Sequence, residues 1–189
     1  MENKLDKLNI VGIAGSLRKG SYNRMLLEAA KEIATDSMTI EEFDLSGIPM
    51  YNTDVEKSAV PEIVTEFKEK IRAADGLLIS TPEYNYSVPG VLKNAIDWAS
   101  RMPKDTPLHQ KPVAMMGGSG GISGTIRAQG HLRQILAHSN MLDLKKPEVL
   151  VTKIQEKFDG NGVLTDDALK QHLIRFLAAF ENWIRIFKK

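Results

Sequence analysis

Short apolar runs alternate with amphipathic stretches along the chain. The apolar runs have the length of strands and predict strands at residues 8–14, 38–43, 76–80, 112–117 and 148–151. The amphipathic stretches predict helices at residues 24–34, 61–73, 88–100, 125–137 and 166–187. The last helix is the clearest, because its apolar residues recur at helical spacing and Thr165 stands before it as an N-cap.

This repeated strand-then-helix order predicts an α/β fold with a mostly parallel sheet and helices on both faces. Ligands in such folds bind beyond the carboxyl ends of the strands, so the loops after the first, third and fourth strands are the candidate binding loops. The polar segments 51–58 and 159–162 are expected to be surface loops. No linker divides the chain, and residues 1–189 are expected to form a single domain.

Composition narrows the possible functions. A net charge of +1 gives no overall attraction to nucleic acid or to an anionic membrane, so small molecules are the expected partners. The chain has no cysteine, which excludes a disulfide, an iron–sulfur cluster and a thiolate nucleophile, and with it a cysteine phosphatase. Redox chemistry therefore requires a bound cofactor. No signal peptide or long apolar segment is found, and a cytoplasmic protein is expected.

The first candidate loop, residues 15–23, is predicted to be a phosphate-binding turn. An apolar strand ends at a glycine, and a short polar segment then opens a helix, so backbone N–H groups and the helix dipole point to one place. The hydroxyls of Ser16 and Ser21 and the amide of Asn23 can donate to phosphate oxygens, and Arg18 supplies positive charge.

The spacing of this loop excludes two common nucleotide motifs. A Walker A loop needs a lysine directly after its second glycine, but Ser21 follows Gly20. The dinucleotide fingerprint G-x-G-x-x-G is also absent from residues 12–17. A mononucleotide is the remaining candidate.

The second and third candidate loops suit a flat ring. Residues 81–90 hold two tyrosines and two prolines, which make a stiff aromatic wall with polar groups for a heterocycle edge. Residues 117–124 hold five glycines, which allow the backbone to approach a flat ligand closely. A phosphate site, an aromatic wall and a polar ring edge together match the needs of FMN.

Several motifs of the sequence together resemble those of a known family. The patterns are G-S-L-R-x-G-S-x-N, then P-E-Y-N-Y-S-x-P-G-x-L-K-N-A-I-D-W, then the glycine-rich loop followed by R-A-Q-x-H-L-R-Q-I-L and K-P-E. Together they resemble the NADPH-dependent FMN reductase family, most strongly its bacterial quinone and chromate reductase branch. The likeness runs from about residue 8 to residue 155.

The resemblance implies a flavodoxin-like three-layer fold with five strands in the order 2-1-3-4-5, bound FMN, and reduction of quinones by NADPH or NADH in two separate steps. Chromate, azo compounds and free flavin are further acceptors that it implies. It places the phosphate contacts at Ser16, Leu17, Arg18, Ser21, Tyr22 and Asn23. It places the ring contacts at Pro82, Glu83, Tyr84, Asn85, Tyr86, Gly118, Ser119 and Gly121.

The cofactor carries the expected chemistry, so no catalytic side chain is assigned. N–H donors around residues 119–121 are expected to stabilise negative charge on the reduced ring. The resemblance also implies a homodimer or homotetramer. Two positions depart from the family pattern: Gly130 stands where the branch has a large aromatic at the tetramer surface, and Gly118 stands where a hydroxyl residue is usual.

Different interpretations compete with this one. Trp98 is expected in the core or at an interface, and the four histidines show no metal-ligand spacing.

The main rival function is a flavodoxin-like electron carrier without its own NAD(P)H activity. The balanced charge disfavours it, because carriers that dock on basic partners are commonly acidic. Two more rivals are a reductase that uses FMN as a dissociable substrate and an NAD(P)-binding regulatory module.

Overall fold

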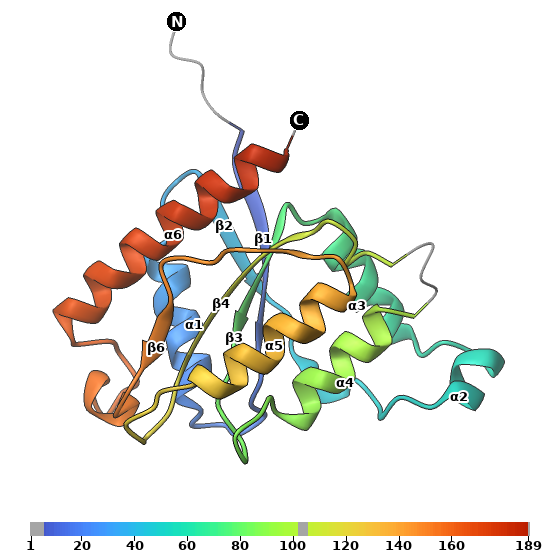
Figure 1. Cartoon of the computed structure of the whole chain (residues 1–189), viewed down its shortest axis with the longest axis horizontal. Coiled ribbons are helices and arrows are strands. Elements are labelled where there is room, and N and C mark those ends of the chain that lie inside the picture. Colours follow the sequence, from blue (N-terminus) through green and yellow to red (C-terminus); the bar gives the residue numbers. More distant parts are fainter. Residues whose placement is uncertain (1–5, 102–105, 189) are drawn as a thin grey trace, which may run out of the picture.

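The computed structural model describes residues 6–101 and 106–188, and its centre is a parallel sheet (Figure 1). The strands are β1 (Leu8–Ala14), β2 (Met38–Glu42), β3 (Gly76–Ser80), β4 (Pro112–Gly118), β5 (Leu142–Asp143) and β6 (Val149–Val151). Their order is β2-β1-β3-β4-β5, and β6 also pairs with β4. This is the predicted flavodoxin-like order.

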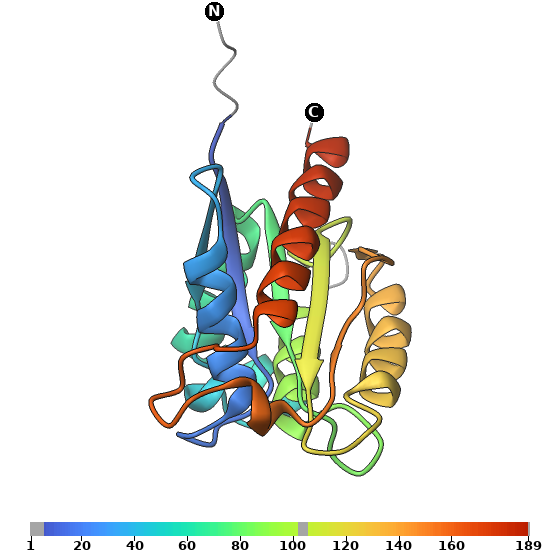
Figure 2. The same ribbon diagram turned by 90° about the vertical axis from the view of Figure 1, so that its left-hand side faces the viewer.

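Helices lie on both faces of the sheet (Figure 2). They are α1 (Tyr22–Ile33), α2 (Thr53–Ser58), α3 (Glu62–Ala73), α4 (Gly90–Ala99), α5 (Ile126–His138) and α6 (Asp167–Phe187), with short 3-10 helices at Leu45–Gly47 and Ile154–Lys157. Helices α1 and α6 bury one apolar core against the sheet, and α3, α4 and α5 bury another. Within the described residues, none of these helices is long and apolar enough to cross a membrane.

The two cores are built from the predicted apolar positions. On the α1 and α6 side, Leu26, Phe176 and Phe180 are fully buried. On the other side, Phe67 and Trp98 fill the space under α3 and α4, which confirms Trp98 as a core residue. Burial of one such side chain stabilises the fold by about 1.5–3 kcal/mol.

The fifth strand position differs from the prediction, because two short strands share it. Val113 of β4 pairs with Asp143 of β5, and Met116 of β4 pairs with Val149 of β6. Between them lies Pro147, which has no N–H group to donate to a strand ladder. The predicted strand at 148–151 therefore covers only half of this edge.

Two local predictions were wrong. Asp166, not Thr165, is the N-cap of α6, and its carboxylate accepts a hydrogen bond from the Leu169 N–H at 2.8 Å. The segment 51–58 is not a loop throughout, because residues 53–58 form α2. Asn52 caps this helix by accepting from the Asp54 N–H, a short-range bond that apolar periodicity does not reveal.

The strands all run in one direction, so their carboxyl ends meet at one edge of the sheet, at the bottom of Figure 1. The loops after β1, β3 and β4 leave the sheet there. The described part of the chain begins and ends at the opposite edge. The sheet order thus brings the three candidate binding loops together, as the strand pattern predicted.

Candidate functional site

The three loops enclose an open crevice of about 210 Å³. Its lining is Ser16, Arg18, Ser21, Tyr22, Asn23, Pro82, Glu83, Tyr84, Gly118, Ser119, Gly120 and Ile154. Most of the residues assigned by resemblance are in this lining. Leu17, Asn85, Tyr86 and Gly121 are not, although each lies within two residues of a lining residue along the chain. Gly120 falls in the segment 119–121 that was expected to supply N–H donors, whereas Ile154 was missed. Ile154 follows β6, which pairs with β4 at the crevice.

The β1–α1 loop leaves donors free. Ser21 is the N-cap residue of α1 but its buried hydroxyl makes no cap hydrogen bond. Among the described residues, the backbone N–H groups of Leu17 and Gly20 have no acceptor in the protein. The exposed Arg18 forms no ion pair with a described carboxylate. An uncapped helix end with a free guanidinium beside it suits a phosphate.

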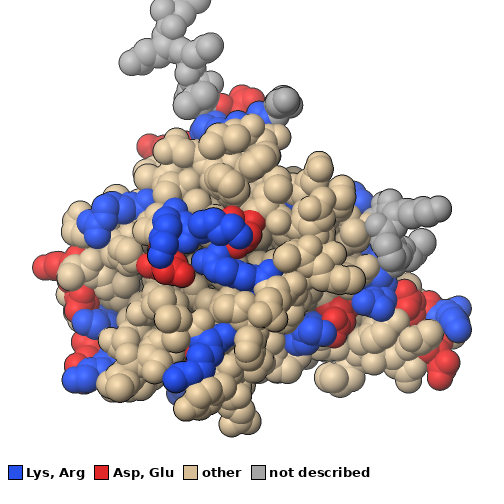
Figure 3. Space-filling model, in the orientation of Figure 1, with Lys and Arg blue, Asp and Glu red and all other residues tan. Residues whose placement is uncertain are grey.

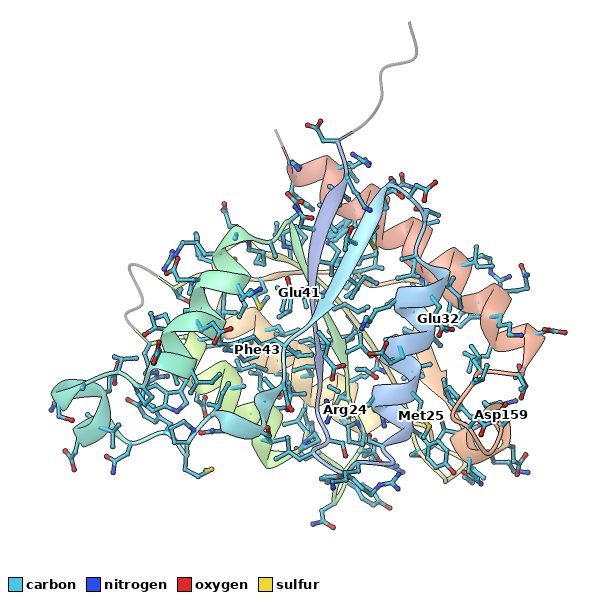
Figure 4. All side chains as sticks on the ribbon, turned by 180° about the vertical axis from the view of Figure 1, so that it is seen from behind. Arg24, Met25, Glu32, Glu41, Phe43 and Asp159 are labelled. Atoms are coloured by element: carbon cyan, nitrogen blue, oxygen red, sulfur yellow. The ribbon has the colours of Figure 1, made fainter. Side chains whose placement is uncertain are left out.

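The next arginine along the chain is already neutralised. Arg24 lies on α1 facing the end of β2 (Figure 4), where its guanidinium is 3.2 Å from Glu42 and 3.8 Å from Asp44. Burial raises the pKa of Glu42, and Arg24 opposes this shift. A larger cavity of about 440 Å³ lies beside this pair, but its lining carries more carboxylates than cations, which disfavours an anion. The carboxylates are Glu28, Glu32 and Glu42, and the cations are Lys19 and Arg24. The smaller crevice, with Arg18, is the better anion site.

Asn23 connects two of the loops. Its Nδ2 donates to the Gly118 carbonyl at 2.9 Å, and its Oδ1 accepts from the Gly118 N–H at 3.0 Å. Its Oδ1 also accepts from the Ser80 hydroxyl at 3.4 Å. The side chain is buried, so these bonds fix the start of α1 to the end of β4. The sequence suggested a phosphate donor here, whereas the structure engages the amide within the protein.

The β3–α4 loop contains a tight turn from Tyr84 to Ser87. The Tyr84 N–H donates to the Ser87 carbonyl at 3.0 Å, and the Ser87 N–H donates back at 2.9 Å. Asn85 and Tyr86 have φ values of 48° and 67°, the left-handed pair of a type I′ turn. This conformation costs a residue other than glycine about 1–2 kcal/mol. The turn presents its tyrosines to solvent, and the Tyr84 hydroxyl lies 3.2 Å from the Ser16 hydroxyl.

Glu83 holds this loop against the start of α5. One carboxylate oxygen accepts from the Arg127 N–H at 2.9 Å and the Ala128 N–H at 3.1 Å. The other accepts from the Arg127 guanidinium at 3.2 Å. Glu83 is in the crevice lining, and its carboxylate caps a helix that follows much later in the chain. Its expected contact with the flavin ring stays a prediction.

The glycine-rich loop has fewer free donors than its composition suggests. The Ser119 N–H donates to the Val151 carbonyl, and the Gly121 N–H donates to the Ser119 hydroxyl, which leaves the Gly120 N–H available. A Cβ on Gly117 would lie 2.1 Å from the Thr81 carbonyl oxygen, so this position requires glycine. A Cβ on Gly118 would lie 2.2 Å from Cδ1 of Ile154, so a hydroxyl residue there would require the Ile154 side chain to move.

These features define a class of protein. A parallel sheet of order 2-1-3-4-5, an open helix end beside Arg18 and an aromatic turn opposite it are typical of flavodoxin-like proteins that bind a singly phosphorylated flavin. Among the described residues, no group of His, Asp and Glu is arranged to hold a metal ion.

Comparison with known proteins identifies the family. Residues 8–156 match the family model described as NADPH-dependent FMN reductase. The chain is 49% identical over 180 residues to an NAD(P)H-dependent FMN reductase of Pseudomonas aeruginosa, covering 95% of this chain and 97% of that protein. It is 45% identical over 186 residues to a quinone reductase of Escherichia coli K12, covering 97% of this chain and 98% of that protein.

A solved structure agrees with the sequence matches. The flavoenzyme NAD(P)H:acceptor oxidoreductase FerB of Paracoccus denitrificans superposes with a TM-score of 0.87 at 34% identity, covering 94% of this chain and 97% of FerB. The chain belongs to the NADPH-dependent FMN reductase family, and it is an oxidoreductase that uses FMN and NAD(P)H. The resemblance drawn from the sequence motifs is confirmed.

Proposed function

We propose that this protein reduces quinones with electrons from NAD(P)H, using FMN held at the crevice between the three loops. The observation that carries the proposal is the pairing of an open phosphate-binding turn with an exposed aromatic turn across the crevice. Relatives at 45–49% identity are named for FMN reduction and quinone reduction. When bound, FMN takes two electrons from the nucleotide and passes them to the acceptor.

The chain's own residues would bind and orient the cofactor. Arg18, the Ser21 hydroxyl and the free N–H groups of the β1–α1 loop would hold the phosphate. The Gly120 N–H would donate to the ring edge. Glu83 is the one carboxylate in the crevice lining, and it is engaged by α5. No carboxylate of the lining is therefore assigned as a proton donor.

The acceptor we propose is flat and largely apolar. Leu17, Tyr84, Tyr86 and Ile122 leave large apolar surfaces exposed at the crevice edge. Such surfaces favour stacking with an aromatic ring over contact with a hydrated ion. Quinones have this character, and azo compounds share it. A supply of reduced pyridine nucleotide is needed for every turnover, which supports the cytoplasm as the place of action.

An anaerobic absorbance experiment tests the proposal. Purified protein carrying FMN should bleach within seconds of adding NADPH, and the flavin absorbance should return when a benzoquinone is added. Initial rates with both substrates varied should give parallel double-reciprocal lines, because NAD(P)H and the acceptor use the same place in turn. Bleaching by dithionite but not by NADPH or NADH would support the electron carrier instead.

We further propose that the protein is a homodimer whose interface borders the crevice and leaves its mouth open to the acceptor. Ile122 is 85% exposed and Tyr86 is 65% exposed, and Figure 3 shows few charges along the lower edge of the molecule. Apolar side chains gathered at one edge favour association with a second copy. Light scattering after gel filtration should give twice the chain mass, and Ile122→Glu should shift the protein toward the monomer. A monomeric wild type would overturn this assembly.

A further inference from the structure

The strained turn at Tyr84–Ser87 is held in place by one helix, α5. Glu83, which precedes the turn, receives the Arg127 and Ala128 N–H groups. The Arg127 guanidinium lies over the Tyr86 ring, 4.0 Å from its centre. At the end of the turn, the Ser87 hydroxyl lies 3.0 Å from Nδ1 of His131. Each of these contacts joins the turn or the residue before it to the first two turns of α5.

Outside α5, the Ser16 hydroxyl also contacts the turn, 3.2 Å from the Tyr84 hydroxyl, but it does not touch the two left-handed residues Asn85 and Tyr86. Asn85 and Tyr86 are exposed, so burial does not offset their left-handed conformation. Within the turn, the two backbone hydrogen bonds between Tyr84 and Ser87 are compatible with this conformation but do not select it. Asn tolerates such a φ value, whereas a tyrosine rarely adopts it. Contacts from outside the turn must therefore favour the observed shape.

Glu83 is the strongest of these contacts, because α5 has no cap of its own. Its N-cap residue Thr125 makes no side-chain cap hydrogen bond, and the Thr125 hydroxyl accepts instead from Gln129 at 3.0 Å. The Glu83 side chain is only 10% exposed, and its negative charge faces the positive end of the helix. A buried carboxylate that receives three N–H groups is fixed in position.

We infer that Glu83 is a positioning residue that sets the Tyr84–Ser87 turn for FMN by binding the N-terminus of α5. The inference deepens the proposed function, since it takes FMN as the ligand of this loop. The Glu83 carboxylate acts through the turn, because both of its oxygens are already engaged by α5. The turn then has its binding conformation before FMN binds, so the binding free energy of FMN is not spent on ordering the turn.

A double-mutant cycle tests this inference. Glu83→Gln keeps the size of the side chain but removes the charge and one acceptor, and it should weaken FMN binding to the apoprotein about tenfold. Tyr86→Gly creates an Asn-Gly pair, which favours the type I′ turn without outside help. In the Tyr86→Gly background, Glu83→Gln should therefore weaken FMN binding less than about threefold. Equal losses in both backgrounds would overturn the inference.

Amide hydrogen exchange of the apoprotein provides a readout that needs no FMN. Glu83→Gln should speed exchange at the Ser87 N–H, and Tyr86→Gly should restore its protection in the double variant. A role confined to capping α5 would change exchange only within that helix, which would contradict the inference. If wild-type protein binds no FMN yet shows this exchange pattern, the proposed function fails while the positioning role stands.

A second capped helix supplies the matched control. Asp166→Ala removes the carboxylate cap of α6, outside the crevice lining. It should lower thermal stability as a lost cap does, while the FMN dissociation constant stays within about twofold of wild type. A loss of FMN binding as large as that of Glu83→Gln would mean that any lost cap disturbs the site, and the inference would fall.

Discussion

Helices α1 and α5 both begin at the crevice, but their first N–H groups are treated in opposite ways. At α1, the N-cap residue Ser21 leaves its hydroxyl unused, and Arg18 stands free beside it. At α5, the carboxylate of Glu83 occupies the helix end and neutralises it. The dipole gives the N-terminus of each helix a partial positive charge, so each of these ends attracts an anion.

The difference shows where a ligand's negative charge can bind. A helix end that already holds a protein carboxylate has no capacity left for a phosphate, whereas an open end with a free guanidinium does. The comparison also separates two kinds of residue in one crevice. Arg18 and Ser21 would act on the ligand, while Glu83 and Asn23 act on the loops. Substitutions should therefore affect binding and stability separately.

The largest effect is expected at the open helix end. Arg18→Ala should weaken FMN binding about 30- to 100-fold, because a charge-assisted contact of about 2–3 kcal/mol is lost. The thermal stability of the apoprotein should change little, since the exposed Arg18 forms no ion pair with described residues and only its contact with the Tyr22 ring, 5.7 Å from the ring centre, is lost. Titration of the apoprotein with FMN, followed by flavin fluorescence, measures this. Lys19→Ala is the control and should stay within about twofold of wild type. Full retention of FMN by Arg18→Ala after gel filtration would contradict the phosphate assignment.

The second effect is expected in stability. Asn23→Ala removes the hydrogen bonds to both backbone groups of Gly118, and it should lower the free energy of unfolding of the apoprotein by about 2 kcal/mol. Urea unfolding monitored by circular dichroism measures this change. If instead stability were unaffected and only FMN binding fell, Asn23 would belong with the ligand contacts and the division between the two kinds of residue would be wrong.

A smaller effect is expected at Ser21. Ser21→Ala should weaken FMN binding about fivefold, the loss of one hydrogen bond of about 1 kcal/mol. The apoprotein should melt at the wild-type temperature, because the hydroxyl makes no cap bond in α1. A drop in the melting temperature of the apoprotein would show that Ser21 caps the helix, and α1 would no longer count as open.

The smallest effect concerns α6, which is capped locally by Asp166. Asp166→Ala should cost about 1 kcal/mol of stability at neutral pH, the typical value of an N-cap. A hydrogen bond from Lys157 and another from the Leu169 N–H lower the pKa of Asp166 below its ordinary 3.8. A lowered pKa means that the stabilisation is complete above the unfolded-state pKa and is lost as pH falls through the folded-state pKa. Urea unfolding at a series of pH values should show wild type and variant converging in acid. A gap that stays constant or widens as the solution is acidified would contradict this assignment.

The fold was largely predictable because its signals are local. Each main strand is a short apolar run, and each long helix has an apolar stripe, so β1 and β3 were predicted at their observed bounds. The divided edge strand was not predicted, because β5 is two residues long and leaves no pattern. The cap of α6 was placed one residue early, since Thr165 and Asp166 are both good N-caps and periodicity does not choose between them.

The motifs identify the family, and through the family the sheet order, because they stand in a fixed order along the chain. Residues close together in the sequence also predict the phosphate turn. Which polar side chains remain available for a ligand depends on the folded molecule. Glu83 meets Arg127 across 44 residues, and Asn23 meets Gly118 across 95. A carboxylate or an amide has the same hydrogen-bonding groups whether it binds a cofactor or a loop, and the partner is fixed by distances that exist only after the sheet has formed.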